Sequence, residues 1–215
     1  MTVQAVVFDV GETLLDETRA WTAWADALHL TPLTLMAVLG AAIDRGEDHR
    51  APFALFRPAA DLRALVAAQT RAGPPIGFGP DDLYPDAVDG LRALVEAGYR
   101  VGIAGNQPVA TEAVFRDLGI DLAFVASSGS LGATKPDPAF FAAIVDRLGL
   151  APSAIAYVGD RVDNDVKPAA AAGMVAVFLR RGPWAWIQAG RDDPPEAAVV
   201  VETLAELPEA LRRLA

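Results

Sequence analysis

The chain has 215 residues and is 53% hydrophobic, which is enough to bury one sizeable core and leaves room for a second, smaller module. Its formal net charge of −10 at pH 7 argues against two kinds of partner, nucleic acid and anionic membrane surfaces, because both attract clustered lysine and arginine. The chain contains no cysteine, which excludes disulfides, thiolate metal sites and a cysteine nucleophile.

The N-terminal residues carry no basic leader of the kind that directs secretion. No apolar segment approaches the roughly 18 residues that are needed to cross a bilayer. We therefore expect a cytoplasmic protein, either a monomer or a homodimer.

The chain begins with a nearly continuous apolar run at residues 2–9, typical of a strand that is covered on both faces. From Glu17 to about residue 73 the apolar residues recur with helical spacing, and we expect Trp21 and Trp24 to be core residues there. Residues 74–80, PPIGFGP, have the composition of a linker. This pattern predicts an all-helical insert at residues 17–79, directly after the first strand.

Beyond the linker, helical and strand patterns alternate. Such alternation predicts an α/β fold, with an open, mostly parallel sheet flanked by helices on both faces. The insert would then interrupt a core formed by residues 1–16 and 80–215. The predicted strands are residues 100–104, 122–126, 154–158 and 174–179, with an edge strand at 199–201, and the predicted helices are residues 85–97, 109–118, 138–148 and 166–172, with an amphipathic helix closing the chain.

Two of the predicted strands end on a carboxylate. Asp9 follows the first apolar run, and Asp160 follows the run that ends at Gly159. Neighbouring parallel strands bring their carboxyl ends to one edge of the sheet, where two carboxylates repel each other unless a cation lies between them. Oxygen ligands without His or Cys nearby favour Mg²⁺. Lys135 follows a third strand and could reach the same edge.

The order and spacing of these residues resemble the haloacid dehalogenase-like hydrolases. The resemblance covers nearly the whole chain, and it implies a Rossmann-like core with a helical cap of the family's first type at residues 17–79. The four motifs of that family fall in order on Asp9, on Gly105-Asn106, on Lys135 with the following Pro-Asp-Pro, and on Gly159-Asp160 with Asp165.

By this resemblance, the protein is a phosphatase of a small phosphorylated metabolite. Asp9 is implied to be the nucleophile, which takes up the phosphoryl group as an aspartyl-phosphate that water then hydrolyses. The resemblance also implies that Asp9, Asp160 and the backbone carbonyl of Gly11 hold Mg²⁺.

Further roles follow from the same resemblance. Lys135 is implied to be catalytic, because it binds the phosphoryl oxygens and offsets the charge of Asp9. Gly105 and Asn106 are implied to bind the substrate as well. Asp165 would support either Lys135 or a metal-bound water, and the sequence leaves these two roles open.

Two positions depart from the family pattern. Gly11 stands where its phosphatases usually carry a second Asp, which protonates the leaving oxygen and later activates water. General acid–base help is worth about 10²–10⁴-fold, so its loss predicts weak activity. Gly105 stands where Ser or Thr usually donates to phosphate, a task left to backbone N–H groups and Asn106. We expect Glu12 to face the cap or a neighbouring loop, because adjacent side chains on an extended segment point to opposite sides.

Other functions stay open. A catalytically degenerate member would bind a phosphorylated ligand or a partner without turnover, as Gly11 and Gly105 suggest. A metal-independent dehalogenase is a weaker alternative. Such enzymes do not need the Gly-Asp pair of the fourth motif, and this chain keeps that pair as Gly159-Asp160. A phosphonate-cleaving relative needs a cap lysine, and residues 17–79 contain none. Residues 180–186, RRGPWAW, could line the rim of the site or mediate self-association.

Overall fold

The computed structural model describes residues 2–58, 61, 64–65, 67–68, 76–190, 197 and 199–214. Its backbone contacts divide the chain into two compact units, Met1–Asp16 with Gly79–Ala215 and Glu17–Phe78. We call the first the core unit and the second the insert unit.

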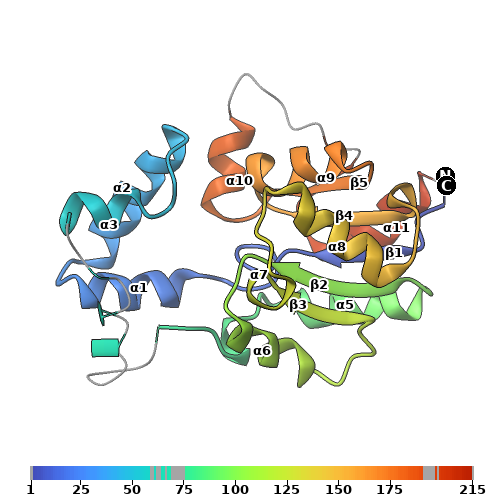
Figure 1. Cartoon of the computed structure of the whole chain (residues 1–215), viewed down its shortest axis with the longest axis horizontal. Helices are drawn as coiled ribbons and strands as arrows, with labels where there is room; N and C mark the ends of the chain where they lie inside the picture. Colours follow the sequence, from blue (N-terminus) through green and yellow to red (C-terminus); the bar gives the residue numbers. More distant parts are fainter. Residues whose placement is uncertain are drawn as a thin grey trace. The chain divides into compact units, whose positions relative to one another are not determined.

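The core unit is built on a six-stranded sheet in which all neighbouring strands are parallel (Figure 1). β1 (Ala5–Phe8) lies between β2 (Arg100–Gly105) and β4 (Ile155–Gly159), and the full order is β3-β2-β1-β4-β5-β6. This is a strand order of the Rossmann fold, so the predicted α/β fold is confirmed. The remaining strands are β3 (Phe124–Ser127), β5 (Val175–Leu179) and β6 (Val199–Val201).

Helices bury the central strand completely, and every side chain of β1 is 0% exposed. One hydrophobic cluster joins β1, β4 and β5 to the helices α8, α9 and α10. Elsewhere α5 packs against β2, α6 against β3, and α11 against β6. These helices are α5 (Ala87–Glu96), α6 (Glu112–Arg116), α8 (Pro138–Leu148), α9 (Lys167–Ala171), α10 (Gly182–Ala189) and α11 (Leu207–Arg212).

The bounds of α8 agree with the predicted helix at residues 138–148. Asp137 caps its N-terminus by accepting a hydrogen bond from the N–H of Ala139 (2.8 Å), and Pro138 suits the first position, where an N–H would have no partner in the helix. Gly149 ends the helix in the left-handed conformation, with φ 62°. These signals fix which side chains of the helix are buried, namely Phe140, Phe141, Ile144 and Leu148.

Some elements differ from the prediction. Residues Val162–Val166 form a π-helix, which shortens the predicted helix at 166–172 to α9. The predicted helix at 109–118 begins as a separate 3₁₀ turn before α6. Two short helices, α7 (Ser128–Leu131) and α10, are absent from the prediction. The Ser and Gly residues of α7 are weak helix formers, and hydrogen bonds between Ser127 and Ser130 hold its first turn instead.

The insert unit contains helices and no strand in its described part. Trp21 is buried, Trp24 is partly buried, and both rings pack against Phe53, with ring centroids 6.0 and 4.8 Å apart. The helices with printed bounds are α1 (Thr18–Ala27), α2 (Pro32–Asp44) and α3 (Ala51–Phe56). Most of the predicted helical pattern at residues 61–73, and the first two residues of the predicted linker, lie outside the described residues.

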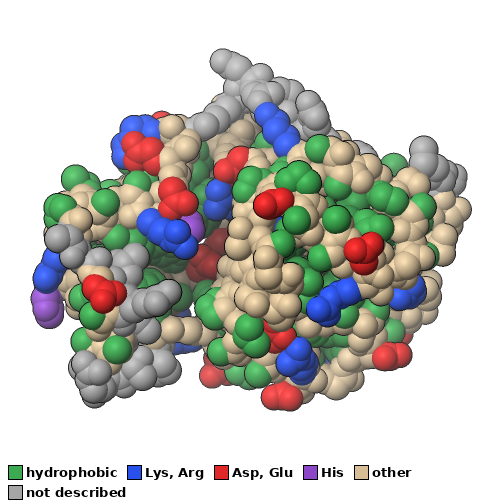
Figure 2. All heavy atoms as spheres, viewed as in Figure 1, with side chains coloured by type: hydrophobic (Ala, Val, Ile, Leu, Met, Phe, Trp, Pro, Cys, Tyr) green, Lys and Arg blue, Asp and Glu red, His purple; other side chains and the backbone are tan. Residues whose placement is uncertain are grey.

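Within the described ranges, no single helix is long and apolar enough to span a membrane, and α1 and α2 meet the criteria of length and hydropathy only as a pair bent by 110°. On the face of the core unit in view in Figure 2, Lys and Arg side chains are interspersed with Asp and Glu.

Candidate active site

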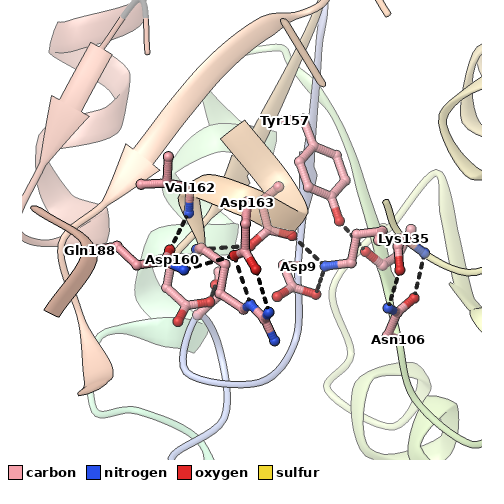
Figure 3. A network of polar contacts seen from close by, with 12 residues as sticks. Asp9, Asn106, Lys135, Tyr157, Asp160, Val162, Asp163 and Gln188 are labelled. Atoms are coloured by element: carbon pink, nitrogen blue, oxygen red, sulfur yellow. Dashed lines mark hydrogen bonds and ion pairs between the residues drawn. The ribbon is translucent and has the colours of Figure 1, made fainter. Parts of the chain in front are cut away.

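Three carboxylates meet where β1 and β4 end (Figure 3). These strands are parallel neighbours, and Asp9 continues their pairing by donating its N–H to the carbonyl of Val158 (2.8 Å). Oxygen atoms of Asp9, Asp160 and Asp165 lie within 4.8 Å of one another, and the three residues are 6%, 1% and 0% exposed. The structure therefore places the two strand-ending carboxylates at one edge of the sheet, with Asp165 beside them.

Lys135 joins this cluster through its amine. Its Nζ lies 2.6 Å from Oδ1 of Asp9 and 2.5 Å from Oδ1 of Asp165. Burial lowers the pKa of Lys135, but the charges of Asp165 and Asp9 outweigh it, so the pKa is raised and the amine stays protonated. Burial and the charge of Asp9 raise the pKa of Asp165 to about 6, although Lys135 acts to lower it.

Asp165 contacts the amine of Lys135, and support of this lysine is one of the two roles that the sequence leaves open. One of its oxygens accepts from the lysine amine, and the other accepts from the N–H of Arg161 (3.0 Å). Gly159 makes room for this carboxylate, because an added Cβ there would lie 2.4 Å from Cγ and Oδ2 of Asp165. The glycine before Asp160 is therefore explained by close packing.

Gly105 is also explained by close packing. A Cβ at this position would lie 2.7 Å from Oδ1 of Asp9 and 2.8 Å from Cγ2 of Val10. The side chain of a serine or threonine would collide with the predicted nucleophile in this conformation. The smaller residue thus lets the Asp9 carboxylate lie against the backbone of β2.

Asn106 contacts the main chain of Lys135 on both sides of its amide. Its Nδ2 donates to the Lys135 carbonyl (2.9 Å), and its Oδ1 accepts from the Lys135 N–H (2.8 Å). The residue therefore positions the lysine, a role that the sequence analysis missed. A substrate contact through its remaining Nδ2 hydrogen stays a prediction.

A tight turn follows β1. The carbonyl of Val10 accepts hydrogen bonds from the N–H groups of Leu14 and Leu15 (2.9 Å each), and Gly11 lies in the turn, partly exposed. The premise that this segment is extended is wrong, because Glu12 has a left-handed backbone with φ 53°.

Glu12 nevertheless faces neighbouring loops, as expected. Its Oε2 accepts a hydrogen bond from the hydroxyl of Tyr84 (2.6 Å). Its side chain also lies against Gly182, where an added Cβ would be 2.4 Å from Oε2. Burial and this hydrogen bond raise the pKa of Tyr84, so its hydroxyl stays a donor. A carboxylate oxygen of Glu12 is therefore held by Tyr84.

Asp160 has an environment that disfavours its charge. Burial and the charges of Asp165 and Asp9 raise its pKa well above the ordinary value. Its Oδ2 is buried without a hydrogen-bond partner, and the hydroxyl of Thr13 lies 3.5 Å from its Oδ1, at the far limit of a hydrogen bond. A divalent cation fits this donor set, because it would supply the missing partner and cancel the repulsion between carboxylates.

Tyr157 is a further residue that the sequence analysis missed. Its hydroxyl donates to the carbonyl of Ala104 (2.8 Å), and its ring centroid lies 5.6 Å from Nζ of Lys135. Phe141 packs edge-on against the same ring. Tyr157 thus joins β2 to β4 and gives the lysine an aromatic wall. The available signal was a tyrosine in an otherwise apolar strand, two residues before Gly159.

Comparisons with known proteins agree with this geometry. A family model described as haloacid dehalogenase-like hydrolase matches residues 3–173. Glyceraldehyde 3-phosphate phosphatase of Methanopyrus kandleri is 32% identical to the chain over 214 residues, covering 89% of this chain and 90% of that protein. Phosphoglycolate phosphatase of Haemophilus influenzae is 36% identical over 103 residues, so the match spans 46% of that relative.

A solved structure shows the same fold. The HAD-hydrolase YfnB of Bacillus subtilis, bound to magnesium, aligns with a TM-score of 0.71 at 20% identity, covering 98% of this chain and 99% of that one. The family match extends over most of the chain, and the Methanopyrus relative aligns with nearly all of it. The resemblance noted in the sequence is therefore confirmed, and the chain belongs to the haloacid dehalogenase-like hydrolases.

Proposed function

We propose that the protein is a Mg²⁺-dependent phosphatase of a small phosphorylated metabolite, acting through an aspartyl-phosphate on Asp9. The observation that carries the proposal is the buried contact between Nζ of Lys135 and Oδ1 of Asp9 (2.6 Å), beside an Asp160 oxygen that has no hydrogen-bond partner. The names of two relatives, phosphatases of glyceraldehyde 3-phosphate and of phosphoglycolate, support this class of substrate.

The reaction has two displacements at phosphorus. In the first, a carboxylate oxygen of Asp9 bonds to phosphorus while the bond to the substrate's ester oxygen breaks, and that oxygen leaves with the electron pair. In the second, water attacks phosphorus and the bond to Asp9 breaks, which returns the electron pair to the carboxylate, and inorganic phosphate is released with the protons of the water. Lys135 places its amine against Asp9 before the attack and attracts the phosphoryl oxygens as a buried positive charge.

Asp9, Asp160 and the backbone carbonyl of Gly11 would hold the Mg²⁺. When bound, the ion supplies positive charge that neutralises the phosphoryl oxygens. The chain's own residues fix the carboxylates for this purpose, since Asp9 is bonded to Lys135 and Asp160 follows a central strand. Asp165 keeps the lysine amine in place (2.5 Å).

Gly11 determines which substrates react fastest. With no carboxyl group at this position, the leaving oxygen departs without a proton from the usual acid, which lowers the rate by about 10²–10⁴-fold for poor leaving groups. Aryl phosphates need no such proton, because a phenolate is a stable leaving group. We therefore expect kcat/KM, which reports the first displacement, to be much higher for aryl phosphates than for alkyl phosphates.

The test is hydrolysis of a panel of aryl and alkyl phosphates with Mg²⁺ and with a chelator, using Asp9→Asn as the control. The proposal requires turnover that depends on Mg²⁺ and is lost in Asp9→Asn. Equal rates for the two proteins would remove it.

A second candidate function is binding of a phosphorylated ligand without turnover. Gly11 favours it, because the usual acid–base group is missing. Beryllium fluoride with Mg²⁺ mimics a phosphoryl group, so tight binding of it that requires Asp9, combined with no turnover across the panel, would favour this function. Halide release from a haloacid that is unaffected by chelator would instead indicate the metal-independent dehalogenase.

A further inference from the structure

The segment Arg181–Gln188 follows β5 and includes most of α10, beyond residue 173, where the family match ends. It contacts two loops of the core unit that carry the predicted site. We call residues 10–15 the Asp9 loop and residues 160–166 the Asp160 loop. Each loop is contacted by a different end of the segment.

Arg181 contacts the Asp9 loop. Its Nη1 donates to the carbonyl of Thr13 (3.0 Å), and its Nη2 lies 2.5 Å from Oδ2 of Asp86 at the start of α5. Its guanidinium also stacks on Tyr84, 4.2 Å from the ring centroid, and Tyr84 in turn donates to Glu12. The arginine therefore ties this turn to α5 and to the end of β5.

Gln188 contacts the Asp160 loop (Figure 3). Its Oε1 accepts from the N–H of Val162 (2.7 Å), and its Nε2 donates to Oδ1 of Asp163 (2.9 Å). Asp163 also pairs with Arg161 (2.8 Å), whose guanidinium lies 5.2 Å from the ring centroid of the buried Trp184. The side chain of Gln188, in α10, thus holds the first turn of the π-helix.

The two loops need such a restraint for an electrostatic reason. Asp9, Asp160 and Asp165 are buried within 4.8 Å of one another, and Lys135 contacts Asp9 and Asp165. Their mutual repulsion acts to separate the loops. Arg181 and Gln188 lie outside the carboxylate cluster. Their hydrogen bonds therefore oppose this separation without competing for the oxygens of Asp9, Asp160 and Asp165.

We propose that the segment Arg181–Gln188 is a positioning element for both loops, with Arg181 holding the Asp9 loop and Gln188 holding the Asp160 loop. Neither residue touches the reacting atoms. The restraint on the loops stands by itself, and its consequence for Mg²⁺ affinity rests on the proposed function. The sequence leaves open whether residues 180–186 line the rim of the site or mediate self-association. The proposal gives most of them a third role, support of the site.

The test is hydrogen–deuterium exchange on the full chain with two variants. Gln188→Ala should speed exchange at the amides of Asp165 and Val166, which donate to the carbonyl of Arg161, by about five- to tenfold. Arg181→Lys keeps a charge for Asp86 but cannot reach Thr13 as well. It should therefore speed exchange at the amides of Leu14 and Leu15 by a similar factor. Each variant should leave the other loop unchanged.

Trp186→Ala is the matched control, because Trp186 lies on the same helix, is 59% exposed, and its ring packs against Arg180. The positioning role would be overturned if Gln188→Ala and Arg181→Lys showed the same exchange rates and the same melting temperatures as the control. Titration calorimetry with Mg²⁺ alone should show about tenfold weaker binding in Gln188→Ala than in the control.

The two proposals fail differently. If the unchanged protein binds no Mg²⁺ and hydrolyses no phosphate, the proposed function is wrong, while the exchange result still decides the positioning role. If the unchanged protein binds Mg²⁺ and the Gln188→Ala variant binds it equally well, with unchanged exchange, the positioning role is wrong and the proposed function stands. Recovery of the variant's hydrolysis at excess Mg²⁺ would support a metal-affinity defect over a general loss of structure.

Discussion

Replacing Gly159 with alanine should destabilise the protein, although alanine ordinarily stabilises a strand relative to glycine by roughly 0.4–1 kcal/mol. The new Cβ would lie 2.4 Å from Cγ and Oδ2 of Asp165, about 1 Å closer than the 3.4 Å at which ordinary contact begins. Because the neighbour is a buried carboxylate bonded to Lys135, relief requires that this hydrogen bond lengthen or break.

The magnitude follows from two contributions. Overpacking of a core costs about 1–3 kcal/mol, and loss of a hydrogen bond to a charged group costs about 1.5–3 kcal/mol. The sum, roughly 2.5–6 kcal/mol, is a large fraction of the 5–15 kcal/mol that is typical of a folded domain. With a urea slope of about 2 kcal/mol/M, the unfolding midpoint should fall by roughly 2 M.

The assay is urea unfolding of Gly159→Ala in the presence of a chelator, compared with Gly79→Ala under the same conditions. Gly79 is the matched control because a Cβ there meets nothing within 4 Å and its backbone is extended, with φ −135° and ψ 178°. If Gly159→Ala unfolds within about 0.5 kcal/mol of the control, the space beside Asp165 is not reserved in the way we describe.

Three other outcomes are expected. Gly105→Ser, which restores the family's usual residue, should lower phosphatase activity by moving the Asp9 carboxylate; a gain in kcat would contradict the packing argument. Gly11→Asp should raise kcat/KM for alkyl phosphates by about 10²-fold and change kcat/KM for aryl phosphates little, because it supplies an acid for the first displacement; equal effects on both values would show that the acid is not limiting in that step. With chelator present, the melting temperature should fall as pH rises from about 4 to about 6, because Asp165 binds its proton more tightly in the folded state than in the unfolded state. Saturating Mg²⁺ should reduce this fall. A melting temperature that rises with pH in chelator would refute the prediction.

The parts of the structure that local sequence determines were predictable. The apolar run before Asp9 predicts a strand covered on both faces, and β1 is fully buried. The Asp-Pro start and glycine end of α8 predict its bounds. Alternating strands and helices predict a parallel sheet, and its carboxyl edge collects Asp9, Asp160 and Lys135. In each case the signal lies within a few residues of the feature.

The remaining features depend on contacts between distant residues. Asn106 binds the main chain of Lys135, 29 positions away, and Arg181 reaches the carbonyl of Thr13, 168 positions away. No local pattern encodes such pairs. The conformation of Glu12 has a related cause, since its left-handed backbone is stabilised by the turn around Val10 and by Tyr84, whereas the sequence pattern predicts a continuation of the strand.

The second carboxylate beside Lys135 matters over a whole turnover of the proposed reaction. Once Asp9 carries the phosphoryl group, its carboxylate no longer has the charge that faces the amine. Asp165 remains within 2.5 Å, so the ammonium keeps a counter-ion throughout both half-reactions and stays anchored while the phosphoryl group arrives and departs. The enzyme can therefore begin the hydrolytic half-reaction without first rebuilding the electrostatics of its buried interior.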